Sequence, residues 1–260
     1  GDTVEGQPDY PMVGLGDGLG IYQQQNEIFL LINHELFSHQ GAVRDHGEKG
    51  AFVSKWQLGG KGLIHGEDLI QSIALYDDGL QQYKKGITGL NRLCSADLPL
   101  QTALLFQDQN VKYGTGVRIF FSGEEVTTKS SNRHGRAFAH VVDGDFAGTS
   151  FVLPAFGKMA FENVVLNPHP QLQTIAILLD DATNRTYDVP KDEKAIEAIH
   201  KNPPSELYIY VGQKLQNAKN PVDAAGLTNG QLYGVQVDGM RKENRNRAIE
   251  PKTRFKLVAL

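Results

Sequence analysis

Residues 117–125 read VRIFFSGEE, a short apolar run that ends in two glutamates. Two other stretches repeat this pattern, since residues 28–35 read IFLLINHE and residues 174–181 read TIAILLDD. Apolar runs of about five residues with polar residues at their ends are typical of strands buried on both faces. Each stretch is therefore expected to form a buried inner strand, and the three strand ends are expected to lie close together near one axis.

Weaker strand candidates follow each of these runs. They lie at residues 51–58 and 72–76, then 136–142 and 150–156, then 206–211 and 231–237. A buried inner strand followed by more polar outer strands is typical of a propeller blade. The sequence thus predicts an all-β fold, a β-propeller with about three four-stranded blades at residues 10–85, 86–157 and 158–260. A sandwich or another all-β stack is the alternative.

One short inserted helix is expected at residues 190–200, because good helix formers there are followed by the stop signal Asn-Pro-Pro at 202–204. Three blades are too few to close a ring, since propellers typically have about four to eight. Residues 1–260 are therefore interpreted as a single partial propeller domain. The remaining blades are expected to come from a missing C-terminal segment or from a second chain.

The composition excludes several classes of protein. The chain has 28 glycines and a formal net charge of -4, which favours many tight turns and argues against a nucleic-acid partner. No apolar run is long enough to form a transmembrane segment. The single cysteine, Cys94, excludes an internal disulfide framework.

The acidic strand ends predict a cation site. Carboxylates that converge on one end of a propeller axis repel each other unless a cation or protons neutralise them. Oxygen ligands suit calcium, whereas a thiolate or imidazole would admit iron or zinc. The alternative is that these acids lie in solvated loops. The oxygen donors considered are Asn33, Glu35, Glu124, Glu125, Asp180 and Asp181.

Three further features leave alternatives open. His34 is either a ligand or a residue packed within its sheet, because strand alternation points it away from its two neighbours. Cys94 lies in a segment, residues 90–97, that is too polar for a simple core strand, and a lone cysteine is more often a buried apolar residue than a ligand. The glycine-rich residues 14–20 are interpreted as a tight entry into the first blade.

The order of these landmarks resembles the PhoX-type alkaline phosphatases over nearly the entire chain. The matching stretches are GLGDGLG at 14–20, LINHE at 31–35, NRLC at 91–94, FFSGEE at 120–125, GKMAFEN at 157–163 and LYIYVGQK at 207–214. The resemblance implies an exported six-bladed propeller with calcium and iron on its axis, which hydrolyses phosphomonoesters. It further implies an iron-ligating Cys94 and acidic ligands at Glu35, Glu124, Glu125 and Glu162.

The sequence and this resemblance together predict a metal-dependent phosphomonoester hydrolase, periplasmic or extracellular, that acts on a small phosphoester. The alternatives are a non-catalytic scaffold or binding protein stabilised by calcium, and a diverged propeller enzyme. No catalytic residue is assigned, and the expected cofactors are calcium and iron. The predicted metal ligands are Glu35, Cys94, Glu124, Glu125, Glu162, Asp180 and Asp181.

Overall fold

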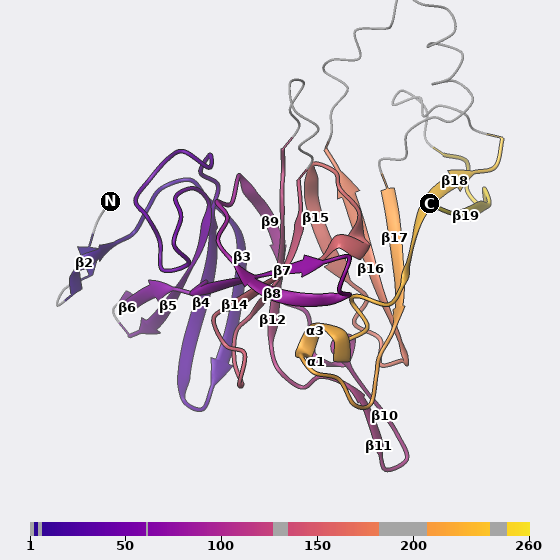
Figure 1. The fold of residues 1–260 in the computed structure, drawn as a ribbon, viewed down its shortest axis with the longest axis horizontal. Coiled ribbons are helices and arrows are strands. Elements are labelled where there is room, and N and C mark those ends of the chain that lie inside the picture. Colours follow the sequence, from indigo (N-terminus) through magenta and orange to yellow (C-terminus); the bar gives the residue numbers. More distant parts are fainter. Residues whose placement is uncertain (1–2, 5–6, 61, 127–134, 182–206, 240–248) are drawn as a thin grey trace, which may run out of the picture.

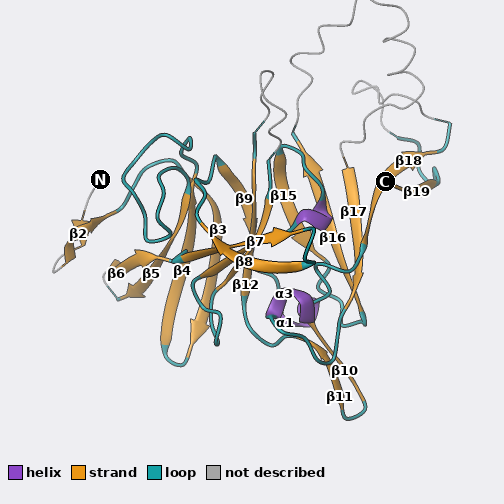
Figure 2. Cartoon of the chain, viewed as in Figure 1, coloured by secondary structure: helices purple, strands orange, loops and turns teal. Residues whose placement is uncertain are grey.

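The computed structural model describes residues 3–4, 7–60, 62–126, 135–181, 207–239 and 249–260. These residues form an all-β, propeller-like fold of three main sheets, as the sequence predicted (Figure 1). Helical structure within them is limited to two four-residue helices, α1 (Gln101–Leu104) and α3 (Pro221–Ala224), and one 3-10 turn at Pro154–Phe156 (Figure 2). The helix expected at residues 190–200 lies outside the described residues.

The first sheet has four strands and the third has five, all antiparallel. The first follows the order β3 (Gly16–Gln24), β4 (Glu27–His34), β5 (Phe52–Gly59) and β6 (Gly62–Asp68). The third follows the order β15 (Phe161–Leu166), β16 (Gln173–Asp180), β17 (Leu207–Gln213), β18 (Gln231–Val237) and β19 (Phe255–Ala259). Each therefore begins with the strand that comes first in the sequence.

The second sheet has six strands instead of the expected four. Its order is β8 (Gln82–Gly86), β7 (Ser72–Asp77), β14 (Thr149–Val152), β13 (Ala137–Val141), β12 (Ile119–Glu124) and β9 (Leu93–Asp97). The expectation that residues 72–76 belong to the first group is wrong, because β7 pairs in parallel with β14. Two small hairpins complete the fold, β1 (Thr3–Val4) with β2 (Gln7–Pro11) and β10 (Leu105–Asp108) with β11 (Val111–Gly114).

Two apolar cores hold the three sheets face to face. The first and second sheets share a core that includes Leu31 and Val53 from one side and Phe120 and Phe138 from the other. The second and third sheets share a core in which Phe121 packs with residues such as Leu178 and Tyr210. Both faces of the second sheet are thus covered, and every residue of β12 is buried.

The outer faces of the first and third sheets are apolar and partly exposed. Ile21 on β3 and Ile28 on β4 are 64% and 42% exposed, and Ile177 on β16 is 40% exposed. In the third sheet, the pairing register aligns Val165, Ile177, Ile209, Tyr233 and Ala259 across all five strands. The run in β16 is therefore buried on one face only, whereas the run in β4 is exposed at its start and buried on both faces from Leu31 to His34.

The innermost strands are β3, β9 and β15, which is a correction to the sequence prediction. Each stands at the edge of its sheet, and β9 contacts both β3 and β15 (Figure 1). The three apolar runs that the sequence favoured as innermost strands lie in β4, β12 and β16, the second strands of the sheets. The strands β3 and β9 approach closely because a glycine of β3 faces β9: a Cβ on Gly18 would collide with Ala96. Gly123 on β12 allows a similar approach to β15, where its Cβ would collide with Phe161.

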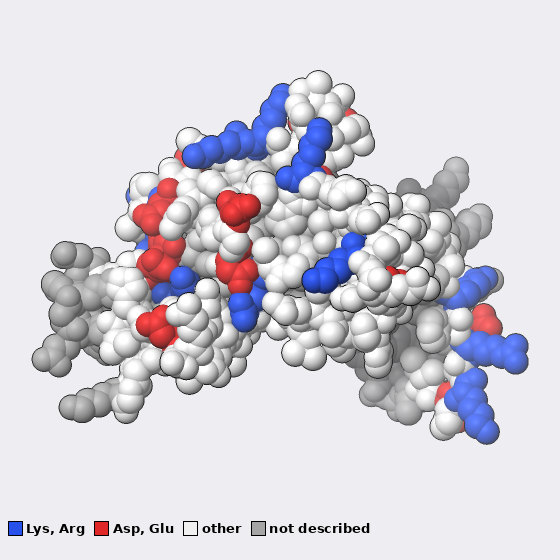
Figure 3. Space-filling view, turned by 90° about the horizontal axis from the view of Figure 1, so that it is seen from below, with Lys and Arg blue, Asp and Glu red and all other residues white. Residues whose placement is uncertain are grey.

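On the face that Figure 3 presents, the lysine and arginine side chains of the described residues stand in small separate groups, with acidic side chains between some of them. None of the helices within the described residues has both the length and the apolar character that crossing a membrane requires.

Candidate metal centre

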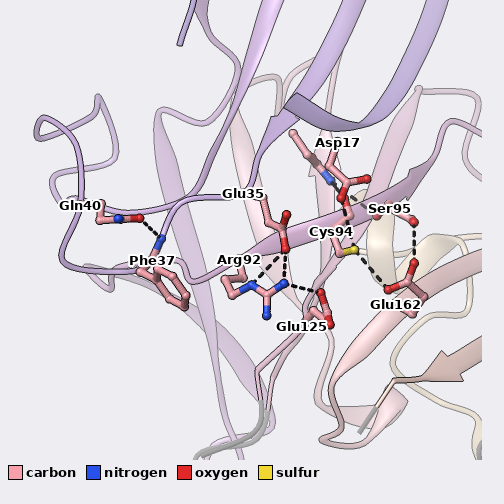
Figure 4. A network of polar contacts seen from close by, with 10 residues as sticks. Asp17, Glu35, Phe37, Gln40, Arg92, Cys94, Ser95, Glu125 and Glu162 are labelled. Carbon is pink, nitrogen blue, oxygen red and sulfur yellow. Dashed lines mark hydrogen bonds and ion pairs between the residues drawn. The ribbon is translucent and has the colours of Figure 1, made fainter. Parts of the chain in front are cut away.

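Cys94 lies at the centre of an acidic group where the three innermost strands meet. Its Sγ lies 3.4 Å from Asp17 Oδ2 on β3 and 3.3 Å from Glu162 Oε2 on β15 (Figure 4). The hydroxyl of Ser95 donates to the other carboxylate oxygen of Glu162 at 3.3 Å. One thiol and two carboxylates from three different sheets therefore face one another.

A second pair of carboxylates lies beside this thiol and shares one arginine. Glu35 follows β4 and Glu125 follows β12, and the guanidinium of Arg92 lies between them (Figure 4). Arg92 donates from Nε to Glu35 Oε1 at 3.0 Å and from Nη2 to Glu125 Oε2 at 2.8 Å. The arginine holds the two acidic loops at a fixed separation.

The residues form two overlapping trios whose donor atoms all lie within 4.8 Å of one another. One trio is Asp17, Glu35 and Cys94, and the other is Cys94, Glu125 and Glu162. We call the five residues together the Cys94 group. Carboxylate oxygens suit hard cations such as calcium, and a thiolate adds affinity for a softer ion such as iron. The donor set therefore fits a metal centre of mixed oxygen and sulfur ligation.

The pKa shifts indicate that negative charge is unfavourable in this group without a cation. Burial, followed by the hydrogen bond to Glu162, raises the pKa of the Cys94 thiol. Burial also raises the pKa of Glu125, against the opposing effect of Arg92. A bound cation would reverse these shifts, because it favours the ionised form of each ligand.

Asn33 forms a hydrogen bond to the backbone of Cys94. Its Nδ2 donates to the carbonyl oxygen of Cys94 at 2.6 Å, and the side chain is fully buried. Its Oδ1 has no hydrogen-bond partner among the described residues, which is uncommon for a buried polar atom. Asn33 therefore fixes the backbone that carries the thiol, and one acceptor atom next to the group is left unsatisfied.

Glu124 does not belong to the Cys94 group. Its side chain is 5% exposed and forms a two-pronged ion pair with Arg136, with Nη2 to Oε1 and Nε to Oε2 both at 2.7 Å. The backbone N–H groups of Asn91 and Arg136 donate to the same carboxylate at 3.0 and 3.1 Å. All of these contacts tie β12 to its neighbours.

Asp180 and Asp181 lie at the end of β16 and contact the segment that enters β15. Asp180 Oδ1 accepts from the backbone N–H of Ala160 at 3.1 Å, and the N–H of Asp181 donates to the carbonyl of Ala160. Neither of the trios found among the described residues includes them. Of the seven predicted ligands, the structure brings together Glu35, Cys94, Glu125 and Glu162.

Asp17 and Arg92 were absent from the sequence-based ligand set. The signal for Asp17 was its position among the glycines of residues 14–20, of which residues 16–20 form the start of β3. Arg92 directly follows Asn91 in the segment that was expected to be too polar for a simple core strand, and that segment contains β9, three of whose five residues are only partly buried. A polar strand with a cysteine is what a metal-lined axis requires.

His34 points away from the Cys94 group. Its Nε2 lies 2.8 Å from Ser54 Oγ and its Nδ1 lies 3.2 Å from the carbonyl of Gly14. The ring stacks on Phe52, and burial lowers its pKa. The contacts of His34 are therefore those of a residue packed within its sheet.

The sequence matches no protein-family model and no curated protein. Among solved structures, the chain is similar to PhoX from Pseudomonas fluorescens, determined in complex with vanadate, a transition state analogue. The alignment has a TM-score of 0.49 and 11% sequence identity. It covers 86% of this chain and 45% of that chain, so this chain corresponds to less than half of the PhoX chain.

Proposed function

We propose that this chain carries the metal-holding part of a phosphomonoester hydrolase of the PhoX type. The observation that supports the proposal is the convergence of Cys94 with four carboxylates at the meeting point of three inner strands. The reaction class comes from the motif resemblance: all five residues lie within its matching stretches, and the resemblance implies ligand roles for four of them, Glu35, Cys94, Glu125 and Glu162. The proposed substrate is a small phosphoester, and the proposed location is the periplasm or the extracellular space.

Each residue of the group has a distinct part in this proposal. Calcium and iron, when bound, would polarise the phosphoryl oxygens and offset the charge that develops during hydrolysis. Asp17, Glu35, Glu125 and Glu162 supply the carboxylate oxygens that hold the cations, and Cys94 selects a softer ion. Asn33 keeps the Cys94 backbone in place by donating to its carbonyl oxygen, and hydrogen bonds of this kind orient metal ligands.

The outer faces of the sheets support the proposal that further β-structure packs on this chain. The third sheet presents a row of apolar residues across its strands, and the first sheet presents Leu19, Ile21 and Ile28. Exposed apolar patches of this kind mark interaction sites. A C-terminal segment or a second chain would supply the additional blades.

Metal analysis together with a phosphatase assay tests the proposed function. We expect the purified chain to contain calcium and iron and to hydrolyse p-nitrophenyl phosphate, and we expect Glu125→Gln and Cys94→Ser to lose both properties. Glu67→Gln is the matched control, because Glu67 is a half-exposed acid on β6 that pairs with Lys55. Calcium alone without hydrolysis would instead support the non-catalytic scaffold, and a chain free of bound metal would overturn both.

A further inference from the structure

We infer that Arg92 lowers the affinity of the Cys94 group for cations, because its guanidinium already pairs with two of the four carboxylates and offsets one of their negative charges. This inference rests on the proposed function in one respect, namely that the group binds a cation. Arg92 would then be a built-in counter-charge that limits how much positive charge the site takes up.

The contacts of Arg92 divide the Cys94 group into two halves. Arg92 bonds to Glu35 through both Nε and Nη2, and to Glu125 through Nη2. Each trio therefore contributes one carboxylate to the arginine and leaves its other carboxylate, Asp17 or Glu162, beside the thiol. A cation that is to use all four carboxylates has to share Glu35 and Glu125 with the guanidinium.

The backbone places the arginine in this position. Arg92 has φ of 47°, in the left-handed region that residues with a Cβ rarely adopt. Its N–H donates to the carbonyl of Leu36 at 2.8 Å, and its own carbonyl accepts from the N–H of Glu125 at 2.9 Å. These main-chain bonds join the two acidic loops without the guanidinium, so a shorter side chain would leave both loops in register.

The charge balance gives the direction of the effect. Four ionised carboxylates and one guanidinium leave three negative charges in the group, and removal of the guanidinium leaves four. Glu35 and Glu125 are only 22% and 15% exposed, so solvent screens their charges incompletely. A divalent cation is therefore bound more strongly once the competing positive charge is gone.

Calcium titration of Arg92→Gln, monitored by calorimetry on the full chain, tests the inference. We expect binding about 10- to 100-fold tighter than in the unmodified chain, the range typical of changes in groups that contact metal ligands. Arg92→Lys retains the charge but loses the fork that bridges Glu35 and Glu125, so its calcium affinity should lie between those of the unmodified chain and Arg92→Gln. Arg118→Gln is the matched control, since Arg118 is similarly exposed and pairs with Asp143 outside the group.

Thermal unfolding with chelator and with calcium provides a second measurement. Without calcium, Arg92→Gln should unfold at a lower temperature than the unmodified chain, because its carboxylates lose their counter-charge, and calcium should restore most of the difference. If the unmodified chain binds calcium and Arg92→Gln binds it equally or more weakly, the inference fails and the proposed function stands. If neither binds calcium, both fail.

Discussion

Replacing Glu124 and Glu125 by glutamine, one at a time, tests whether two adjacent glutamates have separate tasks. Each carboxylate oxygen of Glu124 accepts two hydrogen bonds, one from the guanidinium of Arg136 and one from a backbone N–H. The amide nitrogen of a glutamine would face two of these donors, and the charge that offsets Arg136 would be lost. Glu124→Gln should therefore destabilise the fold severely.

The magnitude follows from the exposure of the two partners. Breaking a buried ion pair by removing one partner costs about 3–5 kcal/mol. Arg136 is 26% exposed and keeps its bonds to Thr88 and Gly89, so the lower end of that range applies, about 3 kcal/mol. For a domain of this size that corresponds to a fall of about 6–12 °C in melting temperature. Glu125→Gln loses one partly exposed ion pair with Arg92, which is worth about 1 kcal/mol or less.

The variant that loses more stability should be the one that keeps its stabilisation by calcium. Glu124→Gln should retain the calcium-induced rise in melting temperature, because Glu124 lies outside the Cys94 group. Glu125→Gln should lose most of that rise. Differential scanning fluorimetry in chelator and in calcium measures both effects. Equal destabilisation of the two variants in chelator, or a calcium response that is lost in Glu124→Gln and kept in Glu125→Gln, would refute the assignment.

Three further predictions concern packing, pH and association. Gly18→Ala should lower the free energy of unfolding by about 1–3 kcal/mol, because the new Cβ meets the backbone of Ala96. Gly14→Ala should have little effect, since its Cβ would meet no atom within 4 Å. Urea titration of both variants checks this difference. Burial, and secondarily His46, lowers the pKa of His140 to about 3. Below pH 6.5 only the unfolded state therefore gains the proton. The free energy of unfolding should fall by up to about 1.4 kcal/mol per pH unit until the pH reaches the folded pKa. His140→Gln should flatten this slope between pH 6.5 and 5, and an unchanged slope would exclude His140 as its source. The chain should self-associate through the apolar face of its third sheet. Ile177→Lys should reduce this association, and Val43→Lys on an exposed loop should not. A monodisperse monomer in sedimentation velocity that also unfolds cooperatively would contradict the prediction.

The sequence predicted the presence of the apolar strands better than their order. The run IFLLINHE covers most of β4 and the run TIAILLDD most of β16, yet both are second strands, and β16 has a partly exposed face along its length. Hydrophobicity identifies strands that pack against a core. The innermost strands instead carry residues of the Cys94 group, namely Asp17, Cys94 and Glu162, and β3 also carries glycines for close approach, so an apolar pattern does not reveal them.

The assignment of β7 to the second sheet had no local signal in the sequence. Its pairing with β14 joins residues more than seventy positions apart, for example Ser150 and Ile73. Bonds from the N–H groups of Gln71 and Ser72 to the carbonyl of Gly148 fix the start of this pairing. Contacts at such a sequence separation depend on how the sheets stack, which the composition of a six-residue strand does not encode.

Strand alternation predicts only part of the difference between the two glutamates at the end of β12. Alternation requires Glu124 and Glu125 to point in opposite directions, but it does not say which of them faces the axis. The neighbouring strands decide this, because Arg136 enters β13 directly beside Glu124, and Arg92 precedes β9 beside Glu125. Glu124 is 5% exposed and pairs with Arg136, whereas Glu125 is 15% exposed and shares Arg92 with Glu35. The functional difference between two identical residues therefore follows from the position of their partners, which only the three-dimensional structure supplies.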